Sequence, residues 1–165
     1  MQSKTKKTFL LSIIFVTILA GMVLSVNNVK ANKDDDDISV TLKIIYANYG
    51  DFDDDKVKDD IIIIVKLKAN IDDYAKCYWY MKLELPSGKT FYFSFNAVIR
   101  ETDGAITIII TTFDSAKEPG CYEATLTGIF FIEDIDEYLV LEDEIKFDPP
   151  GIGPGDPTAS MEIIY

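Results

Sequence analysis

The sequence predicts an all-β protein, a sandwich of about seven antiparallel strands. Seven apolar runs rich in β-branched residues follow one another after residue 37. Short segments containing Gly, Pro, Asp or Asn separate these runs, as turns separate strands. No ten-residue stretch of this region has a convincing helical period. The hydrophobic fraction of 48% is enough for a packed core.

Alternation of apolar and polar residues defines the individual strands. We predict strands over residues 38–48, 61–71, 76–85, 89–99, 105–113, 121–132 and 137–147. In the third of these, Cys77, Trp79 and Met81 would face the core and Tyr78 and Tyr80 the solvent.

The connection between the third and fourth strands sets their register. Pro86 suits position i+1 of a type I turn and Gly88 the left-handed position of a three-residue loop. The pairs predicted from this loop are Leu83 with Phe91, Met81 with Phe93, and Trp79 with Phe95. A two-residue loop would shift the register by one and place the phenylalanines beside charged residues, so burial favours the first register.

Residues 1–31 have the features of a secretory signal peptide. Three lysines precede the apolar run 9–26, and small residues at Val29 and Ala31 predict cleavage after Ala31. A run of about 18 apolar residues could instead remain as a membrane anchor. Either alternative exports the chain, so we expect it to be secreted or held at the extracellular cell surface, with membrane contact only through an uncleaved leader.

Charge and composition exclude several functions. The net charge is −12, and removing the first 31 residues, with four bases and no acid, leaves 12 bases and 28 acids, a net −16. Such a chain repels phosphate backbones, so we expect no nucleic-acid partner. Histidine is absent, which excludes Ser/His and Cys/His catalysis and imidazole-bound metals. No carboxylate pair stands out as a glycosidase centre, and we expect no enzymatic activity.

The predicted organisation has five parts. They are the leader 1–31, an acidic run 32–37, the sandwich 38–148, a Pro/Gly linker 149–157 and a short apolar tail 158–165. The tail could fold back on an edge strand, mark a point where a longer protein was cut, or add to the edge of another subunit.

Two sequence features resemble immunoglobulin-like sandwiches common in prokaryotic surface proteins. Trp79 lies early in the third strand, and the run EPGCYEATLTG opens the sixth, with Tyr122 in the position of the tyrosine near the E–F corner. The resemblance implies that Ala124 and Leu126 face the core. The leader, the strand pattern, the acidic loop and the lack of catalytic groups together lead us to expect a structural or adhesive module, whose partners would be other cell-surface proteins or glycans.

Cys77 and Cys121 are the two cysteines of the chain, and exported thiols often pair. In an immunoglobulin-like topology they begin neighbouring antiparallel strands, so they lie about 20 Å apart at opposite ends. A disulfide joins Cα atoms only about 4.4–6.8 Å apart. This topology therefore favours unpaired thiols, and a bridge would indicate a different strand order.

The segment between the first two predicted strands, residues 50–61, is the one motif with chemical content. Asp51, Asp53, Asp55 and Asp59 occupy relative positions 1, 3, 5 and 9, with the Val57 carbonyl at position 7. Calcium takes six to eight oxygens in irregular geometry, so these residues predict a Ca²⁺ site. The alternative is a solvated acidic turn without an ion.

This loop resembles the DFDGDG-x-x-D calcium loops of FG-GAP and integrin-type repeats, and a turn in some archaeal secreted sandwiches. Two positions depart from the pattern. Lys56 occupies position 6, where Gly normally allows a sharp turn. Ile62 occupies position 12, where an EF-hand has Glu. The loop is therefore not an EF-hand.

Tyr78, Tyr80 and Tyr92 are predicted to form an aromatic patch on an outer sheet face. Such a patch could stack on sugar rings, or it could reflect ordinary cross-strand pairing. The sequence thus predicts an exported, calcium-stabilised structural module without catalysis. The alternative is a module that binds carbohydrate or another ligand through these tyrosines.

Overall fold

A computed structural model describes residues 28–33, 36–132, 137–149 and 156–165. The strands are β1 (Asn28–Lys33), β2 (Asp36–Gly50), β3 (Asp60–Glu84), β4 (Thr90–Phe113), β5 (Tyr122–Ile132), β6 (Glu137–Phe147) and β7 (Thr158–Ile164). The described ranges contain no helix, and so no helix that could span a membrane. The apolar run of the predicted leader and most of the Pro/Gly linker lie outside these ranges. The predicted cleavage point after Ala31 falls within β1.

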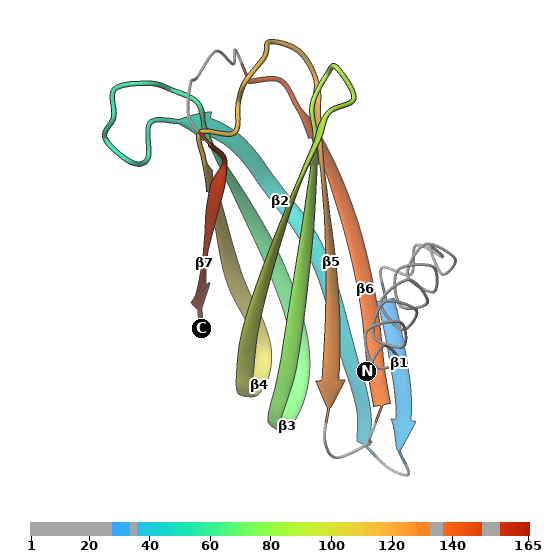
Figure 1. Cartoon of the computed structure of the whole chain (residues 1–165). Helices are drawn as coiled ribbons and strands as arrows, with labels where there is room; N and C mark the ends of the chain where they lie inside the picture. The colour runs from blue at the N-terminus through green and yellow to red at the C-terminus, as the bar shows by residue number, and fades with distance from the viewer. Residues whose placement is uncertain (1–27, 34–35, 133–136, 150–155) are drawn as a thin grey trace, which may run out of the picture.

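The strands form two antiparallel sheets, which confirms the predicted all-β sandwich (Figure 1). One sheet consists of β1, β2, the first part of β3, the last part of β4, and β7. The other consists of the first part of β4, the last part of β3, β5 and β6. The third and sixth predicted strands, which lie in β3 and β5, are antiparallel neighbours, as expected.

Four of the predicted strands join in pairs to form two long strands in the structure. The predicted strands 61–71 and 76–85 form the 25-residue β3, and 89–99 and 105–113 belong to the 24-residue β4. The sequence suggests breaks because polar residues and Gly104 interrupt the apolar runs. The two strands stay paired through this region, with a register shift between Ile71 and Tyr74. The β3–β4 hairpin therefore bends from one sheet to the other without ending (Figure 1).

The predicted hairpin register is confirmed. The three predicted pairs are Leu83 with Phe91, Met81 with Phe93, and Trp79 with Phe95, and all three are present. The Gly88 N–H donates to the Leu85 carbonyl at 2.8 Å, and Gly88 has a φ of 83°. A left-handed residue is needed at this position, and glycine adopts it without a steric penalty.

The core lies between the two sheets. Trp79 and Phe130 are fully buried and meet edge to face, with ring centroids 5.1 Å apart. Ala124 and Leu126 are buried, as the resemblance implied. Tyr122 is also buried, and its hydroxyl donates to the Glu118 carbonyl at 2.8 Å and accepts from the Glu118 N–H at 2.9 Å. This is the geometry of a tyrosine corner, which fixes the chain entering β5.

The apolar tail forms β7 and folds back on its own chain. Thr158–Ile164 pairs antiparallel with Thr107–Phe113 of β4, and Met161 and Ile163 pack against the core. The fold-back alternative is therefore the one that the structure adopts.

Both cysteines are free thiols. Cys77 pairs with Phe130 in the β3–β5 ladder, whereas Cys121 precedes Tyr122 at the other end of the same ladder. The two thiols therefore lie toward opposite ends of this ladder, as expected from the sequence. Burial raises the pKa of the Cys77 thiol to about 12.

Candidate metal centre

The acidic loop 51–59 connects β2 to β3 at one end of the sandwich (Figure 1). The loop after β4, which begins at Asp114, reaches the same place. The Ser115 and Ala116 N–H groups both donate to the Asp59 carbonyl, at 3.0 and 2.8 Å. Two segments far apart in sequence therefore meet at this end of the fold.

Aspartates from these two loops and from the start of β3 form two clusters. One contains Asp51, Asp53 and Asp60, and the other contains Asp55, Asp59 and Asp114. In each cluster, one carboxylate oxygen per residue lies within 4.8 Å of the others. Both clusters offer oxygen ligands alone, which suits a hard cation rather than a soft one.

This arrangement differs from a single ring of ligands. The four predicted carboxylates are divided equally between the clusters, and each cluster gains a third aspartate from outside the predicted set. The Val57 carbonyl stays a predicted ligand, and the Val57 N–H donates to Asp55 Oδ1 at 2.7 Å. Asp54 and Lys56 adopt left-handed backbone conformations, with φ of 64° and 75°, so the chain reverses sharply between the two groups.

Asp60 organises the backbone around the clusters. Its Oδ2 accepts hydrogen bonds from the N–H groups of Phe52 and Asp53, at 2.6 and 3.2 Å. Its Oδ1 accepts one from the Asp114 N–H at 3.0 Å. Asp60 is buried, and both of its oxygens have partners. These contacts hold loop 51–59 against the loop after β4.

Asp59, unlike Asp60, has a carboxylate oxygen without a hydrogen-bond partner among the described residues. Its side chain is only 1% exposed, and this oxygen, Oδ2, is buried. A buried carboxylate oxygen without a partner is costly, because it loses its hydration without compensation. A cation between Asp55, Asp59 and Asp114 would supply the missing interaction.

The electrostatics of the site agree with this geometry. Burial raises the pKa of Asp59, and the nearby charges of Asp114, Asp55 and Asp60 raise it further. The pKa of Asp53 is raised too, first by desolvation and also by neighbouring carboxylates. Crowding of this kind disfavours the ionised side chains unless a cation neutralises them.

The first cluster, formed by Asp51, Asp53 and Asp60, also contains a buried carboxylate oxygen without a hydrogen-bond partner among the described residues. Asp51 Oδ2 accepts from the Lys56 N–H at 3.1 Å, whereas Asp51 Oδ1 is buried and has no partner in the described part of the chain. Asp53 Oδ1 accepts from the Asp55 N–H at 3.2 Å. These local hydrogen bonds shape the loop and leave the remaining oxygens available to a cation.

Asp60 and Asp114 are the site residues that the sequence interpretation missed. Asp60 follows directly on the predicted ligand Asp59, so its proximity could have been anticipated from the loop itself. Asp114 lies more than fifty residues away along the chain and carries no local motif. Only the pairing of β3 with β4, which brings Ile61 opposite Thr112, places Asp114 beside the loop.

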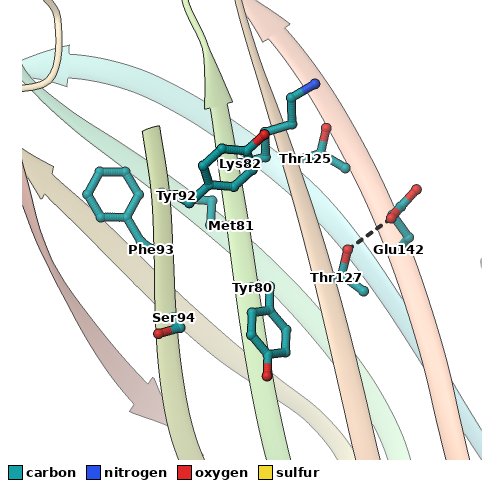
Figure 2. Close-up of a pocket in the computed structure, with 9 residues that line it drawn as sticks. All are labelled: Tyr80, Met81, Lys82, Tyr92, Phe93, Ser94, Thr125, Thr127 and Glu142. Atoms are coloured by element: carbon teal, nitrogen blue, oxygen red, sulfur yellow. Dashed lines mark hydrogen bonds between the residues drawn. The ribbon is translucent and has the colours of Figure 1, made fainter. Parts of the chain in front are cut away.

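The predicted tyrosines lie on the outer face of the second sheet. Tyr78, Tyr80 and Tyr92 are all exposed, by 42%, 43% and 74%. Tyr80 and Tyr92 line a shallow groove, which Figure 2 shows, and Tyr78 lies outside it. The acidic clusters and this groove involve different residues.

Comparison with known proteins finds no family model, no curated protein and no solved structure that matches this chain.

Proposed function

We propose that this chain is an exported structural or adhesive module of the cell surface, that Ca²⁺ stabilises one end of its sandwich, and that it carries out no catalysis. The observation that carries the calcium part is the buried, unpartnered Oδ2 of Asp59 within a cluster of three aspartates. The export part rests on the leader-like composition of residues 1–31.

Calcium is the cation that these ligands favour. The clusters provide carboxylate oxygens from two loops and from the start of β3, and Ca²⁺ accepts six to eight oxygens in variable geometry. Mg²⁺ requires a near-ideal octahedron and gives up its water reluctantly, so loop carboxylates suit it less. Without histidine or sulfur ligands in the clusters, zinc is also disfavoured.

The role proposed for the ion is mechanical. A cation held by Asp55 and Asp59 on one side and by Asp114 on the other would join loop 51–59 to the loop after β4. It would also offset the repulsion among six aspartates between residues 51 and 60, namely Asp51, Asp53, Asp54, Asp55, Asp59 and Asp60. An ion that binds only the folded state stabilises it by mass action.

Thermal melting in Ca²⁺, in Mg²⁺ and in EDTA tests this proposal. We expect Ca²⁺ to raise the melting temperature, EDTA to reverse the rise, and Mg²⁺ to have a smaller effect. At a hundredfold excess over the dissociation constant, the gain in unfolding free energy is about 2.7 kcal/mol. Replacing both Asp53 and Asp55 by alanine should remove the effect, because each cluster loses a ligand.

Asp54→Asn is the matched control, since Asp54 belongs to neither cluster and asparagine tolerates its left-handed conformation. This variant should keep the full calcium response. A melting temperature that does not change up to millimolar calcium would refute the calcium part of the proposal.

The export part has a separate test. Expression in a secreting host followed by mass measurement should give a mature chain that begins at Asn32. Cleavage there removes four of the six residues of β1, so the sandwich must fold without most of that strand. Retention of the whole chain in the cytosol would contradict export.

A further inference from the structure

A shallow groove of about 400 Å³ crosses the outer face of the second sheet (Figure 2). Four strands contribute to it: Tyr80 comes from β3, Tyr92 from β4, Thr127 from β5 and Glu142 from β6. Because the groove is formed by side chains on paired strands, its shape depends on the sheet and not on a loop.

Tyr92 on β4 and Tyr80 on β3 begin a row of aromatic side chains. In the β3–β4 ladder Tyr80 is opposite Ser94 and Lys82 is opposite Tyr92, so the two tyrosines are diagonal neighbours. Diagonal neighbours on one face lie about 7–8 Å apart. Tyr78, two residues before Tyr80 in β3, continues the row on the same face. The row offers flat apolar surfaces in succession to an elongated ligand.

Hydroxyl and carboxylate groups border these rings. Thr127 Oγ1 donates to Glu142 Oε2 at 2.9 Å, which leaves Glu142 Oε1 available as an acceptor (Figure 2). Tyr80, Tyr92 and Ser94 add three further hydroxyl groups to the lining of the groove. The groove therefore combines aromatic faces with several hydrogen-bond donors and acceptors.

The charges of the groove exclude an anionic ligand. Lys82, its one cation, is held by Glu84 at 2.6 Å. Glu142 adds a negative charge, and the chain as a whole has a net charge of −12. An acidic polymer would be repelled, whereas an uncharged ligand would not.

We propose that this groove binds a neutral polysaccharide along the row formed by Tyr92 and Tyr80. Pyranose rings have apolar C–H faces that pack on aromatic rings, whose faces carry partial negative charge. Their edges carry hydroxyl groups that exchange hydrogen bonds with Ser94 and Glu142. This inference goes beyond the calcium-stabilised structural role and does not depend on it.

Affinity electrophoresis tests the proposal with the full chain. Native gels would contain one neutral polymer each, namely hydroxyethylcellulose, mannan, xylan or galactan, and a further gel would contain the acidic polymer polygalacturonate. We expect at least one neutral polymer to retard the protein and polygalacturonate to leave its mobility unchanged. Tyr80→Ala and Tyr92→Ala should each weaken the retardation at least tenfold in polymer concentration, whereas Tyr92→Phe should retain most of it.

Tyr138→Ala is the matched control. Tyr138 is 66% exposed on the same sheet face, its ring packs at a tilt against that of Phe131, and it lies outside the groove. The Tyr138→Ala variant should bind the polymers like the unaltered chain. Unchanged melting temperatures of all the variants would show that they are folded. Retardation by none of the neutral polymers overturns the proposal. So does retardation that survives both alanine substitutions, or equal loss in the Tyr138 variant.

Discussion

The Asp60 carboxylate accepts a hydrogen bond from the backbone N–H of Asp114 at 3.0 Å. This contact joins the first residue of β3 to the loop that follows β4. Its other oxygen binds the N–H groups of Phe52 and Asp53, so one buried side chain fixes two loops. Backbone hydrogen bonds to the Asp60 carboxylate thus order the acidic end of the sandwich.

Asp60→Asn should destabilise the protein whether or not calcium is present. An asparagine retains one acceptor oxygen, and its amide N–H groups would face backbone N–H donors. Leaving buried donors unpaired costs about 1–3 kcal/mol. Urea unfolding in EDTA measures this cost, and Asp54→Asn serves as the control with little expected change. Equal stability of the two variants would show that Asp60 does not hold the loops.

Asp59→Asn should have opposite effects in the two conditions. Without calcium, the substitution removes a buried charge whose pKa burial has raised, so stability should stay equal or rise. With calcium, it removes a ligand, so the calcium-induced rise in melting temperature should be largely lost. Thermal melting with and without calcium checks both effects. Strong destabilisation of this variant in EDTA would contradict our account of Asp59.

The calcium effect should decrease as the pH falls. The pKa of Asp59 is raised in the folded state, mainly by burial, so its ionisation costs stability above that pKa and the cost disappears below the ordinary value. Protons and calcium therefore compete for the same oxygens. The melting-temperature difference between calcium-loaded and calcium-free protein should shrink from about pH 7 to about pH 4.

Calcium-free protein for this comparison is prepared by passage over a chelating resin, because EDTA binds calcium weakly in acid. The Asp59→Asn variant is the control and should show a small difference at every pH. If the calcium-induced difference in melting temperature of the unaltered protein grew toward low pH, it would contradict the prediction.

The two cysteines should differ in reactivity. Burial raises the pKa of Cys77 to about 12, whereas Cys121 is exposed. At about pH 8 a thiol reagent should label one cysteine in the folded protein and two in denaturant, since the thiolate is the reacting form. Labelling of neither cysteine in denaturant without reductant would reveal a disulfide and contradict the described strand order.

Much of the sandwich could be predicted because its signals are local. Alternation along β3 and the Pro86–Gly88 turn together predict the pairing of Trp79 with Phe95 that the structure shows. The continuity of β3 through residues 72 and 73 could not be predicted, because the polar residues there indicate a turn. The pairing of β3 with β4 continues on both sides of a register shift between Ile71 and Tyr74, and this continuation depends on the partner strand rather than on local composition.

The candidate site was predictable in part for the same reason. The spacing of Asp51, Asp53, Asp55 and Asp59 identified the loop. It did not reveal that the ligands divide into two clusters, because the division depends on Asp60 and Asp114. Contact between β3 and the residues after β4 is set by tertiary pairing, which a single loop sequence does not encode.

The most direct test of the central claim is a high-resolution crystal structure of the protein grown in abundant calcium. We expect an electron-density peak for Ca²⁺ between the carboxylates of Asp55, Asp59 and Asp114, with oxygen ligands at about 2.3–2.6 Å. Ordered water alone among these side chains, at hydrogen-bonding distances, would contradict the claim.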